Sequence, residues 1–525
     1  MKIALAQLNP CVGDLESNFD AMMLAARMAH EQGADLLVFP NSALTGAPIE
    51  GLANYEAFIR DAHKYMQKFA EDCPVLSLVS GLSDMDEVRH RADIELFIAG
   101  NGKLESLGVP AKQDAQSCPG FSVAGCNIAV LLGRHFAREV SFEDMDILIE
   151  MCADAFGTSY AAPAAQDGLS RMSAIANACS AYVLSVNLCG ASDSIIFAGN
   201  TSATAPDGSL IHACPIDKAE VFTFEVQSNK EQVYESREQH HLEPEEIMWK
   251  ALVVGTRDYV RKNGFSDVLI GVSGGIDSAV VTTLAVNALG AKHVHGLAMP
   301  GPYSSESSLE DAKELARNLD IDLKIAPINA PLSSFHELLG PLCSGKVEGI
   351  AAENLQARIR GVELMTICNA HNYLVLNTGN KSEAAVGFST LYGDTVGAYA
   401  PIGDVYKSEV IALAKWRRAR AASIPQNCID KKPSAELYPD AKDEDRLPPY
   451  NVLDGILYDH IEEELGAKEL VLSGHEPKVV EQVLKRVQMS EFKRRQEPIS
   501  AHVQGCSLLL GRNWPITNGY KESTS

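Results

Sequence analysis

A short run of residues, Ser273-Gly274-Gly275-Ile276-Asp277-Ser278, combines the groups that hold phosphate. It follows the continuous apolar stretch Val268–Val272, which is typical of a buried strand, and precedes a helical pattern over about 277–289. The two glycines let backbone N–H groups approach an anion closely, the two serines add hydroxyl donors, and the positive end of the helix favours negative charge. Asp277 would be repelled by bare phosphate, so its presence indicates a bridging Mg²⁺. The run therefore predicts a loop that binds pyrophosphate.

A longer polar segment, Thr378–Asp394, follows another apolar run, Leu374–Asn377. It offers hydroxyl and amide groups, the carboxylate of Glu383 for a second metal contact, and a later carboxylate, Asp394. Its length and polarity at the end of a strand disfavour a role in packing alone. We therefore expect this segment to belong to a ligand site at the carboxyl ends of the strands.

Alternating apolar runs and helical patterns divide the chain into parts. Residues 1–225 form one predicted domain, 226–243 a polar linker, 244–513 a second domain, and 514–525 a flexible tail. In the second domain, strands and helices alternate, which predicts an α/β fold with a doubly wound parallel sheet. Residues 433–450 interrupt that pattern and predict either a loop that closes over a substrate or a plain surface insertion.

The elements expected from periodicity are short and regularly spaced. In the first domain we expect strands at 3–8, 36–39, 75–79, 94–99, 128–132 and 183–186, and helices at 17–32 and 169–181. In the second we expect strands at 268–272, 294–299, 323–328 and 374–377, and helices at 244–262 and 277–289.

Composition excludes several classes of protein. The net charge of −24 over 525 residues argues against a partner that is a nucleic acid or an acidic membrane surface. No run of about 18 apolar residues occurs, so no membrane span is expected. The twelve cysteines are scattered without a CxxC pair, which is typical of reduced core residues in a cytoplasmic protein.

The second domain resembles known families at several separate places. The glycine loop resembles that of the ATP pyrophosphatases, an adenine nucleotide α-hydrolase-like group that makes an adenylate and releases pyrophosphate. Together with 378–394, four further segments resemble the NAD synthetase family in order along the chain, and the resemblance covers about 245–500. These segments are Glu353–Arg360, Pro401–Lys407, Lys432–Leu437 and Glu491–Gln496.

This resemblance implies a role for each matching residue. Ser273, Gly274, Gly275, Asp277 and Ser278 would hold the pyrophosphate of ATP, and Asp277 and Glu383 would bind Mg²⁺. Thr378, Lys407 and Ser434 would contact ATP, while Arg358, Asp394 and Lys493 would contact deamido-NAD. The implied reaction adenylates the nicotinate carboxylate of deamido-NAD and then lets ammonia displace AMP. Such catalysis depends on alignment and charge stabilisation and uses no protein nucleophile.

Residues 1–225 resemble a nitrilase-like amidase domain, which implies an α-β-β-α sandwich that makes ammonia from glutamine. The matching stretches are Met1–Asn9, Asp35–Pro40 with Ala43–Gly46, and Val186–Leu188 followed by Phe197–Ser202. Such amidases use a Glu–Lys–Cys triad with the Cys as nucleophile. Here Asn41 stands where the family has Glu, and Gly133 stands where it has Cys, while Lys112 aligns with the Lys.

The double loss predicts an NAD synthetase that uses ammonia, free or from a separate protein, with the first domain kept for structure or assembly. One alternative is a glutamine-dependent NAD synthetase with a rearranged glutaminase site. Others are a different ATP pyrophosphatase that amidates a nucleotide or modifies tRNA, and a non-enzymatic scaffold. The family resemblance also implies a homodimer or a larger homo-oligomer.

Overall fold

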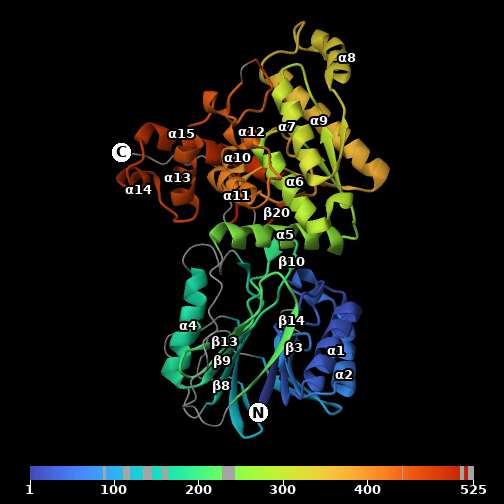
Figure 1. Cartoon of the computed structure of the whole chain (residues 1–525), viewed down its shortest axis with the longest axis vertical. Coiled ribbons are helices and arrows are strands. Elements are labelled where there is room, and N and C mark those ends of the chain that lie inside the picture. The colour runs from blue at the N-terminus through green and yellow to red at the C-terminus, as the bar shows by residue number, and fades with distance from the viewer. Residues whose placement is uncertain are drawn as a thin grey trace. The chain divides into compact units, whose positions relative to one another are not determined.

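The computed structural model describes residues 1–86, 90–109, 119–133, 145–156, 164–226, 243–439, 441–508 and 514–517, with the backbone alone over 164–169. The chain divides into two compact units, Met1–His241 and Leu242–Ser525 (Figure 1). Lys112, most of the predicted linker and most of the predicted tail lie outside the described residues. Among the described helices, none is long and apolar enough to cross a membrane.

The first unit contains two six-stranded sheets. One sheet has the strand order β14 (Glu220–Glu225), β1 (Lys2–Gln7), β2 (Leu36–Val38), β3 (Ser77–Leu82), β4 (Ile94–Gly100) and β5 (Lys103–Gly108). The other has the order β13 (Leu210–Ala213), β12 (Ser202–Thr204), β9 (Tyr182–Val186), β8 (Ile147–Met151), β7 (Cys126–Leu132) and β6 (Gly120–Val123). A short hairpin joins β10 (Ala191–Ser192) to β11 (Ile195–Ile196).

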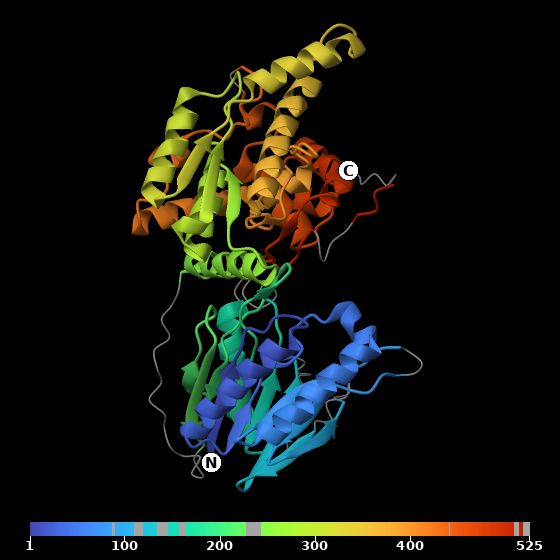
Figure 2. The same ribbon diagram turned by 90° about the vertical axis from the view of Figure 1, so that its right-hand side faces the viewer.

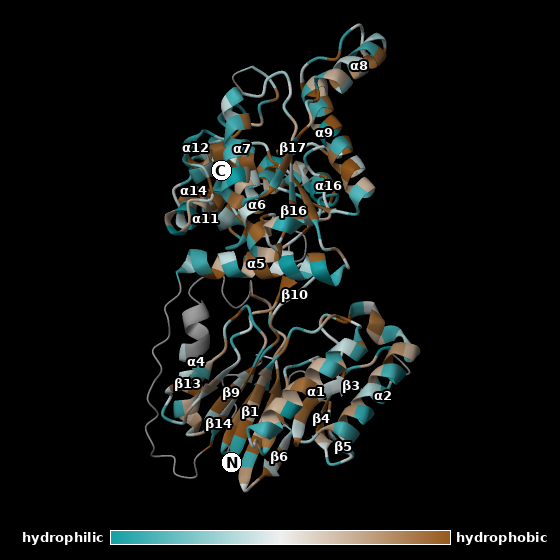
Figure 3. Ribbon diagram, turned by 45° about the vertical axis from the view of Figure 1, so that its right-hand side comes forward, coloured by the Kyte–Doolittle hydropathy of each residue, from teal (hydrophilic) through white to brown (hydrophobic). Residues whose placement is uncertain are grey.

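Alternate residues of β1 face opposite ways and show how the layers pack. Ile3 and Leu5 belong to a core that joins both sheets, whereas Ala4 and Ala6 face helices α1 (Leu15–Glu31) and α2 (Glu56–Asp72). Figure 3 shows the mixture of apolar and polar residues along these helices that one-sided packing requires. Helix α4 (Ala164–Cys179) packs on the outer face of the second sheet, and η1 (Glu50–Asn54) precedes α2. The predicted α-β-β-α sandwich is therefore confirmed.

In the described part of the second unit the strands form one sheet, and all of its strand pairs are parallel. Its order is β17 (Asp322–Ile325), β16 (Val294–Ala298), β15 (Val268–Gly271), β18 (Leu374–Leu376), β19 (Tyr399–Ala400) and β20 (Ile499–Ser500). The chain winds outward in one direction from β15 to β17 and in the other from β18 to β20. The strand order therefore reverses between β15 and β18, and ligands of such sheets bind at the carboxyl ends of the strands at this point. The predicted doubly wound parallel sheet is confirmed.

Helices cover this sheet, and a further group of helices lies beside it (Figure 2). Four of them form a separate apolar cluster beside the sheet: α10 (Lys381–Val386), α13 (Tyr450–Ile461), α14 (Ala467–Leu472) and α15 (Pro477–Met489). The helices are α5 (Pro244–Lys262), α6 (Ile276–Leu289), η2 (Ala291–His293), α7 (Glu306–Leu319), α8 (Asn329–Leu339), η3 (Gly340–Leu342), α9 (Ile350–His371), α10 (Lys381–Val386), α11 (Lys407–Arg420), α12 (Gln426–Asp430), η4 (Asp443–Asp445), α13 (Tyr450–Ile461), α14 (Ala467–Leu472), α15 (Pro477–Met489) and α16 (Glu491–Arg494).

Some predicted boundaries were wrong for identifiable reasons. The strand expected at 323–328 ends at Ile325, because Ile328 already caps the start of α8. The helix expected at 169–181 ends at Cys179, because Ser180 has a left-handed backbone with a φ of +49°. The strand β8, which pairs with both β7 and β9, was not predicted.

A buried lysine ties the helical cluster to the sheet. The Nζ atom of Lys381 lies 2.8 Å from Asp404 and 2.7 Å from Glu462, and it donates to the carbonyl of Cys506. Burial alone would lower the pKa of Lys381, but the two carboxylates outweigh it and raise that pKa. Asp404 also accepts hydrogen bonds from the backbone N–H groups of Val503 and Gln504.

Replacing Lys381 by Met should destabilise the second unit strongly. Removal of one partner leaves two carboxylates buried without their cation, which costs roughly 3–5 kcal/mol. We expect a lower urea midpoint in equilibrium unfolding, while Lys478→Met, which changes an exposed lysine on α15, should leave it unchanged. Equal midpoints for both variants would show that Lys381 does not stabilise the unit.

Candidate active site

The predicted phosphate loop lies between β15 and α6, at the point where the strand order reverses. Gly274 has a φ of +81°, and a Cβ atom there would lie 2.1 Å from the carbonyl oxygen of Ser308, so glycine is required at this position. The hydroxyls of Ser273 and Ser278 lie 3.1 Å apart, and the N–H of Gly275 donates to Ser273. Helix α6 begins at Ile276, so its N-terminal N–H groups are available to an anion.

A buried ammonium group joins this loop to the segment that follows β18. The Nζ atom of Lys407 pairs with a carboxylate oxygen of Asp277 and lies 3.7 Å from Glu383. Asn380 donates to the other oxygen of Asp277 at 3.1 Å and caps α10 by accepting the N–H of Glu383. The loops after β15, β18 and β19 therefore meet at one cluster of charges.

The charges in this cluster are strongly shifted from their ordinary behaviour. Burial alone would lower the pKa of Lys407, but Asp277 and Glu383 outweigh it, so the net pKa is raised and the lysine stays charged. Removal from water raises the pKa of Glu383 to about 8, although Lys407 acts in the opposite direction. Such shifts are typical of functional sites.

The same groups fit a magnesium ion. Asp277 and Glu383 both reach Lys407, so their carboxylates converge beside the phosphate loop. Carboxylate oxygens are the protein ligands that Mg²⁺ prefers, and nucleotide phosphates complete its coordination. The donor set therefore agrees with the Mg²⁺ site expected from the sequence.

A cavity of about 350 Å³ opens at these strand ends. It is large enough for a small organic ligand or part of a dinucleotide. The predicted residues that line it come from four separate segments of the second unit. They are Ser273, Gly275, Asp277, Ser278, Thr378, Glu383, Asp394, Lys407 and Ser434.

Three predicted residues do not line this cavity. Gly274 is the close-packed turn described above. Arg358 is exposed and donates to the carbonyl of Leu391, whereas Arg360, two positions further along α9, does line the cavity. Lys493 donates to the carbonyls of Gly387 and Ser389 at 2.7 and 2.6 Å. The contacts of all the predicted residues with ATP or deamido-NAD remain predictions.

Two carboxylates at another part of the cavity are held away from their usual ionisation. Burial raises the pKa of Asp394 to about 6 and that of Glu497 to about 7. Nearby cations offset part of this rise: Lys493 and Arg360 lower the pKa of Asp394, and Arg494 and Lys493 lower that of Glu497. Glu497 was not predicted as a site residue, because nothing in its local sequence marks it.

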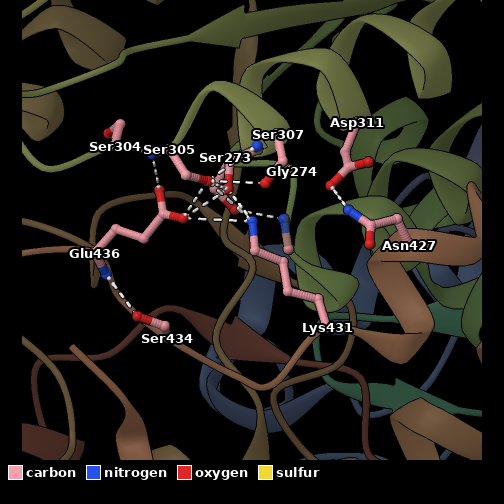
Figure 4. A network of polar contacts seen from close by, with 12 residues as sticks. Ser273, Gly274, Ser304, Ser305, Ser307, Asp311, Asn427, Lys431, Ser434 and Glu436 are labelled. Carbon is pink, nitrogen blue, oxygen red and sulfur yellow. Dashed lines mark hydrogen bonds and ion pairs between the residues drawn. The ribbon is translucent and has the colours of Figure 1, made fainter. Parts of the chain in front are cut away.

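The segment 433–450, predicted as a closing loop or an insertion, contributes to the cavity through Ser434, Glu436 and Asp443. Glu436 accepts hydrogen bonds from the N–H and hydroxyl of Ser305 and from the hydroxyl of Ser308, at 2.7–3.1 Å (Figure 4). Burial favours its neutral form, but these bonds and Lys431 hold its pKa below the ordinary value. Glu436 therefore anchors the segment to the start of α7, next to the phosphate loop.

The first unit brings two of the predicted glutaminase positions to one place. The N–H of Asn41 donates to the carbonyl of Cys152 at 3.2 Å, and the N–H of Gly133 donates to that of Met151 at 2.8 Å. The side chain of Asn41 accepts hydrogen bonds from Ser42 and Ser80. An amide at this position cannot act as a general base, and Gly133 has no side chain. Among the described residues, the thiol beside Asn41 belongs to Cys152, which is buried.

The second unit therefore has the properties of a nucleotide-binding α/β enzyme that handles pyrophosphate, and the first unit has an amidase-like sandwich. Residues 248–497 match the family described as NAD synthase, and residues 2–88 and 134–235 match the family described as carbon-nitrogen hydrolase.

Relatives match along the whole chain. The glutamine-dependent NAD(+) synthetases of Thermotoga maritima and Acinetobacter baylyi are 35% and 34% identical to it, and each alignment covers 99% of both chains. The solved structure of glutamine-dependent NAD+ synthetase from Acinetobacter baumannii with ADP is 30% identical, covers 99% of both chains and has a TM-score of 0.74. A structure from Cytophaga hutchinsonii, at 16% identity and a TM-score of 0.85, shows the same fold.

The chain belongs to the NAD synthetase family, in the form that joins a carbon-nitrogen hydrolase part to an NAD synthase part. It is a ligase that forms a C–N bond, and the family predicted from the sequence is confirmed.

Removal of the Glu436 carboxylate should loosen the segment that carries Ser434. Glu436→Ala loses three accepted hydrogen bonds, each worth about 0.5–1.5 kcal/mol. We expect the KM for ATP to rise about tenfold or more with a smaller change in kcat, measured by AMP release. Glu444→Ala, which removes an exposed carboxylate from the same segment, is the control. An unchanged KM in Glu436→Ala would exclude the anchoring role.

Proposed function

We propose that the second unit adenylates deamido-NAD with ATP and then amidates it to NAD, releasing AMP and pyrophosphate. The observation that carries this proposal is the convergence of Asp277, Glu383 and Lys407 beside the Ser273–Ser278 loop, at the reversal of the strand order. That arrangement offers backbone donors for pyrophosphate and a fixed set of charges around them. Family membership supports the same substrates.

In the first step, an oxygen of the nicotinate carboxylate forms a bond to the α-phosphorus of ATP, and the bond to the pyrophosphate oxygen breaks. The N–H groups at the start of α6 and the two serines offset the charge on the leaving group. Lys407, kept charged by its neighbours, adds a cation at the same place. A Mg²⁺ ion held by Asp277 and Glu383 would neutralise phosphate charge when it is bound.

In the second step, ammonia attacks the carbonyl carbon of the adenylate, a C–N bond forms, AMP leaves and one proton is lost. The cavity walls hold the two reacting groups together, and this alignment supplies much of the rate. Arg360, Asp394 and Glu497 lie on the wall of the same cavity and would surround the deamido-NAD side of the site.

The nitrogen of the new amide could come from ammonia, as the sequence predicts, or from glutamine. Relatives that span the whole chain are named glutamine-dependent, so the comparisons favour glutamine as the donor over ammonia alone. Glutamine, with a rearranged site in the first unit, is therefore the first candidate. Cys152 is the thiol that such a site would use, because its carbonyl accepts the N–H of Asn41 and its neighbour Met151 accepts that of Gly133.

Ammonia from outside the chain is the second candidate, because of the residues at positions 41 and 133. Asn41 and Gly133 follow β2 and β7 and donate to the adjacent residues Cys152 and Met151. They stand where the family's Glu and Cys would stand, and neither can perform their chemistry. The first unit would then serve structure or assembly alone.

A comparison of nitrogen donors separates the two candidates. The purified full chain receives deamido-NAD, ATP and Mg²⁺ with either glutamine or ammonium, and NAD and AMP are measured. If glutamine is the donor, it should support a rate comparable to that with ammonium, and Cys152→Ser should abolish only the glutamine rate. If ammonia is the donor, only ammonium should work, and its apparent KM should fall as the pH rises.

The controls separate the synthetase from the amidase. Asp277→Asn should lose most of the rate with either donor, whereas Cys126→Ser should change neither rate. No release of AMP with either donor in the presence of deamido-NAD would refute the synthetase proposal itself.

We also propose that the chain forms a homodimer or a larger homo-oligomer. Helix α8 projects from the rest of the second unit, as Figures 1 and 2 show. Large apolar side chains are exposed on α8, on η3 and at the start of α9. They are Phe335, Leu338, Leu342 and Ile350. Exposed apolar groups close together in this way are typical of protein–protein contact surfaces.

Charged substitutions on this surface should dissociate the assembly. We expect the double variant Leu338→Lys, Leu342→Lys to have a lower molar mass than the unmodified protein in light scattering after size-exclusion chromatography. Leu472→Lys replaces an exposed leucine on α14 and should leave the mass unchanged. A monomeric unmodified protein, or an unchanged mass in the double variant, would contradict the proposal.

A further inference from the structure

The first unit holds a group of three side chains that the synthetase reaction does not use. His212 lies on β13, Cys214 directly follows that strand, and Glu220 begins β14. A ligating atom from each of the three lies within 4.8 Å of the other two. The Nε2 atom of His212 lies 3.1 Å from a carboxylate oxygen of Glu220.

The chemistry of these donors selects one kind of cation. An imidazole nitrogen, a thiolate sulfur and a carboxylate oxygen are the ligands that Zn²⁺ takes in proteins, at about 2.0–2.3 Å. Mg²⁺ and Ca²⁺ prefer oxygen ligands only. Small movements of the side chains would bring the three atoms to the separations of a tetrahedral site, whose fourth position would remain open to water.

The backbone around the three residues is fixed by the sheets. The N–H of Cys214 donates to the carbonyl of Thr201 at 2.8 Å. The side chain of Gln7 donates to the carbonyls of Pro215 and Lys218, each at 2.6 Å, and so holds the connection between the two strands. The donors are thus placed before any ion arrives, which reduces the cost of binding.

An ion can reach this place from solvent. The side chains of His212 and Glu220 are 23% and 35% exposed, while Cys214 is 3% exposed. The ring of His212 packs against Phe222, with 4.2 Å between the ring centroids. Partial exposure on one side and packing on the other are compatible with an ion held at the edge of the sandwich.

We propose that His212, Cys214 and Glu220 bind a zinc-type divalent cation. Because β13 belongs to one sheet and β14 to the other, the ion links the two sheets of the sandwich at this edge. This site is separate from the Asp277 and Glu383 carboxylates in the second unit. Its occupancy stabilises the first unit, since a ligand that binds only the native state raises its stability.

Cobalt titration tests the proposal through a spectroscopic signal. Untagged full chain, stripped with a chelator, is titrated with Co²⁺, and the absorption is recorded. We expect one equivalent to produce a thiolate-to-cobalt charge-transfer band, which Zn²⁺ then removes. Ions at Asp277 and Glu383 have oxygen ligands and cannot produce this band, so Asp277→Asn should retain it.

Variants decide which residues hold the ion. Cys214→Ser should lack the band, and Glu220→Gln should raise the apparent Kd at least about tenfold, as the loss of even an indirect partner does. Cys179→Ser, a substitution of a partly exposed cysteine on α4, should behave like the unmodified protein. Zinc should also raise the melting midpoint of the unmodified chain and not that of Cys214→Ser. No charge-transfer band in the unmodified chain, or an equal band in Cys214→Ser, would overturn the proposal.

Discussion

The ligand site of the second unit depends on one buried ammonium group. Lys407 is only 2% exposed, and a lysine in such a place is tolerated only when carboxylates accompany it. Asp277 and Glu383 provide them, from loops that follow two adjacent strands. The ion pairs therefore fix the separation of the phosphate loop from the segment after β18, and with it the width of the ligand site. Loss of Lys407 would leave both carboxylates without the cation that they share.

The strand order explains why this cluster forms where it does. Because β15 and β18 are neighbours but their onward connections run in opposite directions, the loops that follow them separate and leave a crevice. Asn380 lines the crevice and serves both sides, since it caps α10 and donates to Asp277. The backbone of Lys407 is held in turn by the hydroxyl of Ser382 at 2.9 Å. Local caps and long-range ion pairs thus support the same geometry.

The sequence was sufficient where the site is contiguous. The positions of the Ser273–Ser278 loop and of the segment that carries Glu383 could be predicted, because each segment follows an apolar run that forms a central strand. The sequence was insufficient where the direction of a side chain decides whether it reaches the cavity. Arg358 and Arg360 are two positions apart on α9 and so point to different sides of the helix, and only Arg360 reaches the cavity.

Long-range partners were the other limit of prediction. Glu436 lies in a recognisable segment, but Ser305 and Ser308 are more than 120 residues away, and only the folded chain shows that they meet. The same holds for the first unit, where apolar strands predicted the sandwich but not the meeting of His212, Cys214 and Glu220. Those three residues come from strand edges and a connection, where periodicity carries little information.

In the first unit, the residues that build the fold are different from those that would decide its chemistry. Its core consists of alternate strand residues such as Ile3, Leu5 and Ile149, whereas Asn41 and Gly133 lie just beyond the ends of strands. Substitution at such ends would change a site without removing buried apolar area, so the sandwich would lose little stability. Sequence identity over the whole chain reflects hundreds of positions, whereas the choice of nitrogen donor depends on a few residues. Overall similarity to glutamine-dependent relatives and the residues at these two positions therefore carry independent information, and a change of donor would leave the family, the fold and the site around Lys407 intact.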